Sequence, residues 1–326
     1  MKRLALSFWM VLCAGAMPGV VTAADSRPYP DKPVRLVVPF PPGGGVDATG
    51  RVLAQKLTEA WRQQVIVDNR TGAGTTIGTE IAARSAPDGY TLLLTNNALA
   101  ISAGLYTKLR YNTGKDLQPV TQVLQAPFVL VIPSKLAAQN MKDLIAMAKA
   151  KPGEIALANT GVGSGPHLAG VLFGIMSGTS LNHIPYKGGG PAIQDLIAGR
   201  VQMLFTTPLA AMPHVQTGRL RAVAVTSGKR AATLPDIPTV AEAGVPGYDV
   251  STWYMLLAPA TLPPPVLAKI NADAVAGLKQ PDAVKILGSE GAELVLGSPA
   301  AASALLQSEL VRWVKVIKEA NVKPED

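Results

Sequence analysis

The sequence predicts an α/β protein of two lobes, each a mostly parallel sheet flanked by helices with a ligand cleft between them. Three observations support this fold class. Short β-branched runs alternate with helical periodicity along most of the chain. The 326 residues are enough for two domains with cores of their own. Two segments, 119–133 and 244–248, interrupt the alternation and are read as crossings between the lobes.

The first lobe begins with a buried strand at 34–38, where four of the five residues are aliphatic. A helix follows over 49–61, because apolar residues recur there at helical spacing. A strand at 65–67, a helix at 76–84 and a strand at 91–95 continue the pattern. Repeated β-then-α units are typical of parallel sheets covered by helices.

The alternation resumes in the second lobe. We expect strands at 129–132, 155–158, 181–184 and 201–205, and helices at 141–150, 167–176 and 192–198. The return crossing leads into an extended segment at 250–257 and helices at 264–279 and 299–320. Two crossings predict a discontinuous first lobe, residues 25–126 with 249–326, around a second lobe of residues 127–248.

The first 24 residues have the layout of a secretory signal peptide. Lys2 and Arg3 precede an uncharged stretch that is broken at Pro18-Gly19 and ends in small residues. Its length would also suit a retained membrane anchor, but the break argues against that. Cys13 does not follow a small residue, as lipidation would require. We expect residues 1–24 to be removed after export.

Composition excludes several kinds of site. Cys13 is the only cysteine and lies in the signal segment, so the mature chain has no thiol for disulfides, zinc or catalysis. The three histidines, His167, His183 and His214, match no metal-binding spacing, and we expect no metal and no cofactor.

Charge points to anions rather than to nucleic acid. The formal net charge of +8 falls to +6 without the signal segment, and the basic residues are spread along the chain. Only 5% of residues are aromatic. A groove that binds nucleic acid usually has clustered Lys and Arg together with aromatic rings on which bases stack. The excess of basic over acidic residues therefore produces a diffuse positive field that favours anions.

A loop rich in proline and glycine, Pro39–Asp47, joins the first strand to the first helix. Its glycines leave backbone N–H groups open to a ligand, and a helix starting at about Ala48 would direct its positive end to the same place. Ligands of open α/β sheets sit beyond the carboxyl ends of strands. The alternative is a tight turn in which Asp47 caps the helix.

Two loops of the second lobe repeat this arrangement. Thr160–His167 and Tyr186–Ala192 each connect a strand to a helix and are rich in glycine. This repetition favours binding over simple turns. None of the loops has the Gly-Lys-Ser/Thr of a phosphate-binding loop or the complete G-x-G-x-x-G of a dinucleotide site. Ser164 has the wrong spacing for a nucleophile elbow, so catalysis is not expected.

With these loops, the chain resembles the Bug family, the solute receptors of tripartite tricarboxylate transporters. The match extends from about Tyr29 to the last helix. The stretches that carry it are Pro39–Gly44 with Asp47 and Arg51, Asp68–Arg70 with Gly72–Gly74, Ala86–Leu92, Tyr186–Gly188, Leu234–Thr239, and Glu242 with Gly244 and Pro246–Tyr248. The resemblance implies a two-lobe periplasmic-binding-protein fold and a non-enzymatic receptor, located in the periplasm, that closes on a carboxylated solute for its membrane transporter.

The residues and the resemblance together give a set of candidate ligand-binding residues. They are Phe40, Gly44, Gly45, Asp47, Thr95, Asn96, Thr160, Gly161, Ser164, His167, Gly188, Gly189, Gly190, Pro191, Ala192, Phe205 and Thr206. Phe40 is a candidate either for covering the ligand or for packing at the hinge. Trp253 and Tyr254 are expected in the core or hinge rather than in the cleft, because they begin an extended apolar segment.

The resemblance also implies an aspartate at the position of Thr206, where this chain departs from the pattern of the family. Without that acid, a di- or tricarboxylate or an aromatic acid fits the cleft better than an amino acid. A sensor that presents its bound form to a membrane kinase is an alternative function, and a periplasmic hydrolase is a weaker one. We expect a monomer that does not bind nucleic acid.

Overall fold

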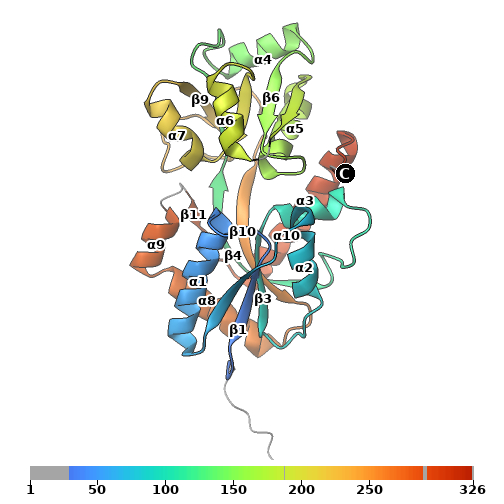
Figure 1. Cartoon of the computed structure of the whole chain (residues 1–326), viewed down its shortest axis with the longest axis vertical. Helices are drawn as coiled ribbons and strands as arrows, with labels where there is room; N and C mark the ends of the chain where they lie inside the picture. Colours follow the sequence, from blue (N-terminus) through green and yellow to red (C-terminus); the bar gives the residue numbers. More distant parts are fainter. Residues whose placement is uncertain (1–28, 187, 289–291, 325–326) are drawn as a thin grey trace, which may run out of the picture.

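The computed structural model describes residues 29–186, 188–288 and 292–324, which form two lobes stacked along the long axis (Figure 1). The predicted signal peptide, residues 1–24, lies outside the described residues. We call the lobe that holds the first strand lobe 1 and the other lobe 2. In the described part of the chain, no helix combines the length and apolarity needed to cross a membrane.

Lobe 1 is built on a six-stranded sheet. Its strands are β1 (Val34–Val38), β2 (Val65–Asn69), β3 (Thr91–Asn96), β4 (Leu117–Pro127), β10 (Ser251–Pro259) and β11 (Glu293–Leu294). Its helical elements are α1 (Gly45–Trp61), η1 (Ala73–Thr75), α2 (Thr76–Ala83), α3 (Ala98–Leu105), α8 (Pro264–Leu278), α9 (Pro281–Gly288) and α10 (Pro299–Glu319). The strand order is β11-β4-β10-β3-β1-β2.

Lobe 2 holds a five-stranded sheet with the order β7-β6-β8-β5-β9. Its strands are β5 (Val129–Pro133), β6 (Ala156–Asn159), β7 (Asn182–Pro185), β8 (Met203–Thr206) and β9 (Leu220–Val225). Its helices are α4 (Met141–Ala150), α5 (Gly165–Ser177), α6 (Gly189–Ile197) and α7 (Pro208–Gln216).

Both sheets are mixed, whereas the sequence predicted mostly parallel ones. β1 is parallel to β2 and β3, and β6 is parallel to β7 and β8. The antiparallel pairs are those of β10 with β3 and β4, of β11 with β4, and of β5 with β8 and β9. Within each lobe, the strand by which the chain leaves and the strand by which it enters run in opposite directions: β4 and β10 in lobe 1, β9 and β5 in lobe 2.

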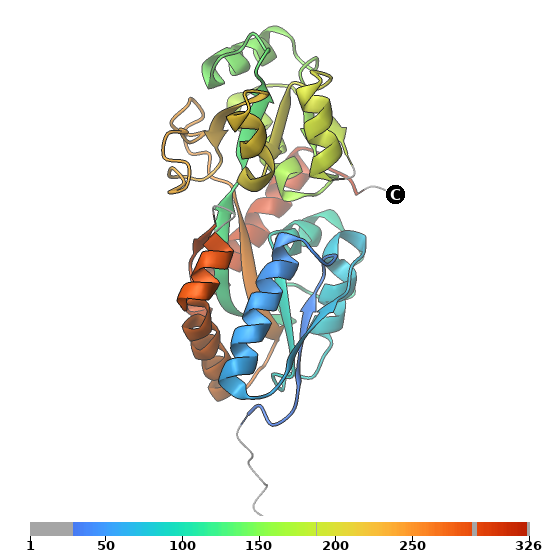
Figure 2. The same cartoon turned by 60° about the vertical axis from the view of Figure 1, so that its left-hand side comes forward.

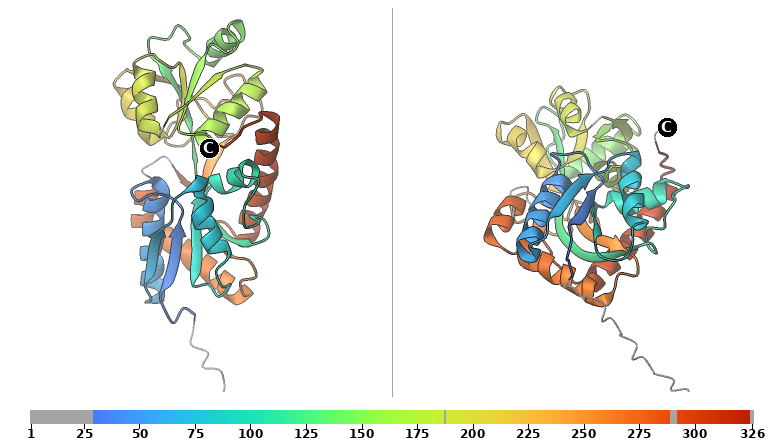
Figure 3. Two further views of the ribbon diagram at one scale, coloured as in Figure 1. Left: turned by 45° about the vertical axis from the view of Figure 1, so that its right-hand side comes forward. Right: turned by 60° about the horizontal axis from the view of Figure 1, so that its bottom comes forward.

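Alternation along the strands of lobe 1 divides its core into two layers. Leu36, Leu94 and Leu256 belong to the layer formed with α1 and α8. Val37 and Leu93 belong to the layer formed with α2, α3 and α10. The C-terminal helix α10 returns along lobe 1, and its end reaches lobe 2 (Figure 3). Helices on both faces explain why β1 and β3 read as continuous apolar runs.

Two chain segments connect the lobes (Figure 2). β4 passes into β5 through the single residue Phe128, and the chain returns between β9 and β10. Thr226 holds the two crossings together: its Oγ1 accepts the N–H of Phe128 at 2.8 Å, and its carbonyl accepts the N–H of Val250 at 2.8 Å. Tyr248 is fully buried and donates to the carbonyl of Ala169, so the Gly/Pro segment before it packs on lobe 2.

The structure differs from the predicted elements at several points. α1 begins at Gly45 rather than at 48 or 49, and α3, α7, β9 and α9 were not predicted. α3 is apolar on most sides, so it lacks helical periodicity, and α7 contains Pro213. β1 and α4 have the predicted bounds.

Candidate functional site

A cavity of about 430 Å³ lies between the two lobes at the hinge. Lobe 1 and the crossing strands contribute Phe40, Asn96, Asn97, Ala98, Phe128, Thr252 and Tyr254. Lobe 2 contributes Thr160, Ser164, Gly165, Pro166, Gly189, Thr206, Thr207 and Ala210. Among the described residues that line it, none carries a charged side chain. Any charge recognition in this cavity therefore comes from backbone groups and from polar neutral side chains.

Four helices begin at this cavity. Ala98 is the first residue of α3, Gly165 that of α5 and Gly189 that of α6, while Thr207 is the N-cap of α7. The first N–H groups of a helix have no partner within the helix, and its dipole places a partial positive charge there. Four such ends around one uncharged cavity form a field suited to an anion.

The Pro39–Asp47 loop reaches the cavity through Phe40 only. Gly44 and Gly45 lie at the start of α1, on the end of lobe 1 that faces lobe 2 (Figure 2), but they do not line the cavity. Since β1 and β3 are parallel neighbours, the loops that follow them lie at the same sheet edge.

Asp47 is 2% exposed and holds this loop together. Its Oδ2 accepts the N–H of Gly43 and Nε of Arg51, both at 2.9 Å. Its Oδ1 accepts Nδ2 of Asn69 at 2.9 Å, and the same nitrogen lies 3.0 Å from the carbonyl oxygen of Phe40. Burial opposes ionisation, but the hydrogen bonds from Arg51, Gly43 and Asn69 outweigh it and lower the pKa of Asp47 to about 2.

This geometry corrects the interpretation of Asp47 as the N-cap. Gly44 is the N-cap of α1, and Asp47 is the third helical residue, reaching back to a loop N–H group. The predicted helix start at Ala48 was wrong because the glycines at 44 and 45 join the first turn. Both carboxylate oxygens of Asp47 are engaged within the protein, and its side chain does not line the cavity.

The Thr160–His167 loop reaches the cavity through Thr160 and Ser164. The Thr160 hydroxyl donates to Oγ of Ser164 at 3.0 Å, and this Oγ accepts the N–H of His167 at 3.3 Å. Ser164 is therefore the N-cap of α5. The imidazole of His167 accepts from Gly163 N–H rather than from Ser164. Gly161 is anchored to Oδ1 of Asn159 and lies outside the lining.

In the loop before α6, too, only some of the candidate residues line the cavity. Gly188 is the N-cap, with a φ of 101° that favours glycine, and Gly189 lines the cavity. Gly190 and Pro191 are exposed and lie outside the lining. Ala192 is fully buried in the core of lobe 2, because it faces inward from the first turn of the helix.

Strand alternation separates the remaining candidate pairs. Thr206 lines the cavity, whereas its neighbour Phe205 is fully buried and packs on Phe173 in the core. Asn96 lines the cavity, whereas Thr95 is fully buried within β3. Phe205 and Thr95 therefore support the site from behind and do not face it.

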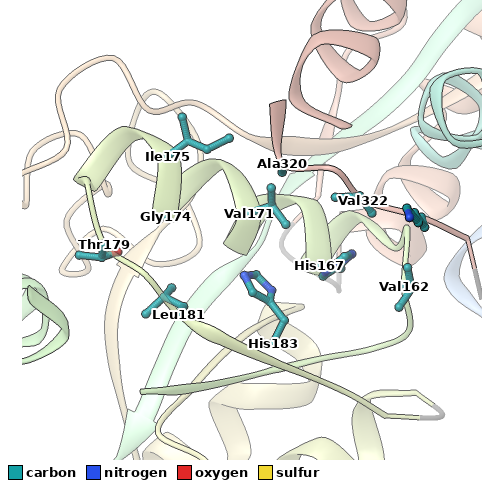
Figure 4. Close-up of a pocket in the computed structure, with 11 residues that line it drawn as sticks. Val162, His167, Val171, Gly174, Ile175, Thr179, Leu181, His183, Ala320 and Val322 are labelled. Atoms are coloured by element: carbon teal, nitrogen blue, oxygen red, sulfur yellow. The ribbon is translucent and has the colours of Figure 1, made fainter. Parts of the chain in front are cut away.

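His167 faces a different cavity, of about 390 Å³, on the other side of α5. Figure 4 shows its ring there with that of His183 on β7; the ring centroids are 5.2 Å apart. Val322, beyond the end of α10, lines the same cavity. Burial, and then the neighbouring His183, lower the pKa of His167 to about 4, and burial also lowers the pKa of His183. Both rings are thus neutral at pH 7.

Several lining residues were missed by the sequence reasoning. They are Asn97, Ala98, Phe128, Gly165, Pro166, Thr207, Ala210, Thr252 and Tyr254. Tyr254 was expected in the core or hinge, but it faces the cavity, while its neighbour Trp253 is buried and donates to Glu309. Successive residues of a strand point to opposite faces of the sheet, so alternation along β10 would have predicted that Trp253 and Tyr254 lie on different faces. Asn97 had a signal too, since it directly follows a strand.

Two mixed sheets in separate lobes, flanked by helices and joined by crossing strands, are the architecture of periplasmic binding proteins. Residues 49–322 match the tripartite tricarboxylate transporter family receptor. The protein BugT of Bordetella pertussis is 38% identical over 310 residues, which cover 94% of this chain and 95% of BugT. The chain belongs to this receptor family, as its resemblance to the Bug proteins indicated.

Solved structures are similar over nearly the whole described chain. A protein of R. palustris with adipate is 33% identical with a TM-score of 0.78, covering 91% of this chain and 100% of that one. MatC of Rhodopseudomonas palustris with bound malate is 29% identical with a TM-score of 0.75, covering 89% and 100%.

Proposed function

We propose that this protein is a periplasmic receptor that binds a small carboxylate between its lobes and delivers it to a tripartite tricarboxylate-type transporter. The observation that carries the proposal is the uncharged cavity at which α3, α5, α6 and α7 all begin. A carboxylate at a helix N-terminus gains typically about 0.3–1 kcal/mol per helix, and more where water is excluded. Four helices together hold an anion without any cationic side chain.

The nature of the lining supports a carboxylate over other solutes. An organic cation would need an acidic side chain, and the described lining of the cavity has none. Thr206 lines the cavity at the position where an aspartate would pair with a ligand ammonium group. The relatives with bound adipate and malate are consistent with this ligand class.

The proposed site is narrower than the set of candidates from the sequence. Phe40, Asn96, Thr160, Ser164 and Gly189, together with Thr206, are proposed to contact the ligand. Gly44, Gly45, Gly161, Gly188, Gly190 and Pro191 are proposed to shape the loops around it, and Asp47 to hold the first loop in place.

Binding is proposed to close the lobes about the two crossings, with lobe 1 formed by residues 25–126 and 249–326 and lobe 2 by 127–248. A ligand that contacts both lobes binds the closed state more tightly than the open state. The difference between these two binding free energies stabilises the closed state. The receptor is proposed to act without catalysis, because Ser164 serves as a helix cap and His167 faces another cavity. A monomer is also proposed, as expected of a receptor that diffuses to its transporter.

Thermal unfolding with a ligand panel tests this proposal. Adipate, malate, citrate, benzoate and glutamate are added separately to the mature protein, with glucose as the neutral control. A ligand that binds only the folded state raises Tm, by an amount set by the ratio of its concentration to Kd. At least one carboxylate is expected to raise Tm while glucose does not. A panel in which no carboxylate acts would refute the proposal.

A further inference from the structure

A second cavity lies on the other side of α5 from the cavity between the lobes. Its volume is about 390 Å³, and the two cavities share no lining residue. Ser164 and Pro166, at the start of α5, line the first cavity, whereas His167, Val171 and Ile175 line the second. Small-molecule sites in proteins commonly have volumes of this size. We call the second one the α5 cavity.

Both lobes contribute to the α5 cavity. α5, β7 and the turn between them form most of its wall, and Ala320, Val322 and Lys323, at the end of α10, close one side (Figure 4). Asn321 has a φ of 50°, and the N–H of Val322 donates to the carbonyl of Ile317 at 3.0 Å. This helix ending turns Val322 onto the hydrophobic core. The segment that follows α10 is therefore held in place as part of the wall.

The imidazole of His167 offers a donor without an acceptor. Its Nδ1 accepts the N–H of Gly163 at 3.1 Å, so the proton of the neutral ring is on Nε2. Within the described chain, no group accepts a hydrogen bond from Nε2. Nδ1 of His183 is sealed in the interior, whereas Nε2 of His167 keeps accessible surface. An acceptor that enters the cavity can therefore reach this donor.

A cation lies at the same end of the cavity. Lys323 lines the cavity, is exposed, and forms no ion pair with any described residue. It directly follows Val322, which Figure 4 shows at the His167 end of the cavity, away from Ile175 and Leu181. The described lining contains no acidic side chain. An N–H donor and an ammonium group at one end favour a single carboxylate there.

The opposite end of the cavity is apolar. Val171, Ile175 and Leu181 form it, and Ile175 is 44% exposed on the surface of α5. An apolar ligand body placed against these side chains would remove apolar surface from water, which is favourable. A second carboxylate placed there would lose hydration without gaining a partner. The two ends together therefore select a ligand with one charged and one apolar end.

We propose that the α5 cavity is a second ligand site, which takes a small monocarboxylic acid with an apolar body. The carboxylate accepts from Nε2 of His167 and pairs with Lys323, while the body covers Ile175 and Leu181. Such a ligand connects lobe 2 to the end of the chain, which belongs to lobe 1. This site goes beyond the proposed function, because it shares no residue with the cavity between the lobes.

NMR of the histidine rings reads this site directly. His167 and His183 line the α5 cavity, whereas His214, the third histidine, lines neither cavity and serves as an internal reference. With labelled histidine at pH 7.5, hexanoate is expected to shift the signals of His167 and His183 to saturation and to leave His214 unchanged. Adipate and hexanol are expected to bind here at least about fivefold more weakly, because adipate adds an acid at the apolar end and hexanol lacks the charge.

Variants at the two ends separate this site from the cavity between the lobes. Lys323→Gln removes an exposed charge and is expected to weaken hexanoate binding about threefold. Ile175→Asp places a charge at the apolar end and is expected to weaken it at least about tenfold. Lys318→Gln and Met176→Asp are the matched controls, since these exposed residues belong to the same helical segments and lie outside the lining. Both controls are expected to keep the wild-type affinity.

The donor is tested by His167→Asn, which keeps an acceptor for the N–H of Gly163 but lacks Nε2. With His183 as the remaining reporter, hexanoate is expected to bind about fivefold more weakly. The absence of any shift with hexanoate in the wild type would overturn the second site. So would equal shifts in the wild type, Ile175→Asp and Lys323→Gln, because the signals would then report a ligand bound elsewhere. Both results leave the proposed function standing, since it rests on the other cavity.

Discussion

At the scale of single residues, the loop that carries Phe40 depends on one carboxylate. Asp47 accepts hydrogen bonds from Gly43, Arg51 and Asn69, and Asn69 also holds the carbonyl of Phe40. Its position in the sequence suggested either a ligand contact or a cap. The contacts show that the Asp47 side chain connects the loop to α1 and β2. Asp47 therefore positions Phe40 through Asn69 without facing the cavity itself.

Asp47→Asn is expected to lower the free energy of unfolding by about 1–3 kcal/mol, because it places an NH₂ group against donors and removes the ion pair. Urea unfolding measures the change, and Asp236→Asn at an exposed position is the control. Affinity for a bound carboxylate is expected to fall less than tenfold. A loss of a hundredfold at unchanged stability would instead indicate a direct ligand contact.

The same residue predicts a pH dependence. Its pKa is lowered to about 2, so the unfolded chain takes up this proton before the folded one does. The contribution of Asp47 to stability is complete above its ordinary carboxyl pKa and is lost as pH falls from about 4 toward about 2. Urea midpoints of the wild type should therefore decrease more steeply in this range than those of Asp47→Asn.

At the scale of elements, the sequence predicted those with a strong local pattern. β1 and α4 have their predicted bounds because β1 is a short, almost entirely aliphatic run and the apolar residues of α4 recur at helical spacing. α3 was missed because a helix that packs on several sides has no polar face to reveal its period. Tyr254 was placed in the core because composition alone does not tell which face of a strand a ring occupies.

The candidate site was predictable at strand-to-helix loops and at the strand ends Asn96 and Thr206, which the family resemblance supplied. Phe40, Thr160, Ser164 and Gly189 belong to such loops and line the cavity. Thr252 and Phe128 lie on the crossings, and their place at the cavity depends on how distant segments pair in the two sheets. That pairing has no local signal.

The contact of α10 with β10 gives a prediction at this scale. Glu309 is 6% exposed, and its Oε2 accepts the indole N–H of Trp253 at 3.0 Å and that of Trp313 at 2.8 Å. Glu309→Ala leaves two buried donors unpaired, so it should lower the free energy of unfolding by about 2–4 kcal/mol. Urea unfolding followed by tryptophan fluorescence measures this. Glu319→Ala, near the exposed end of the helix, should change stability by less than about 0.5 kcal/mol.

At the scale of the whole molecule, the two lobes contact each other where the Thr160–His167 loop meets α3. Gly163 in this loop has a φ of 76°, and a methyl group there would lie 2.6 Å from Cδ2 of Leu105 in lobe 1. The absence of a side chain at Gly163 thus lets a loop of lobe 2 rest on a helix of lobe 1.

Gly163→Ala should hold the lobes apart, because the new methyl group would lie 2.6 Å from Cδ2 of Leu105 and this side chain, 7% exposed, is confined by the core. The control is Gly153→Ala, since Gly153 has a φ of 78° and open space around its Cα. Both variants carry the same cost of a positive φ, about 1 kcal/mol, so the difference between them isolates the lobe contact. X-ray scattering should show a larger radius of gyration for Gly163→Ala alone, and its carboxylate affinity should fall about tenfold relative to Gly153→Ala. Equal radii and equal affinities in the two variants would mean that this contact plays no part in closure.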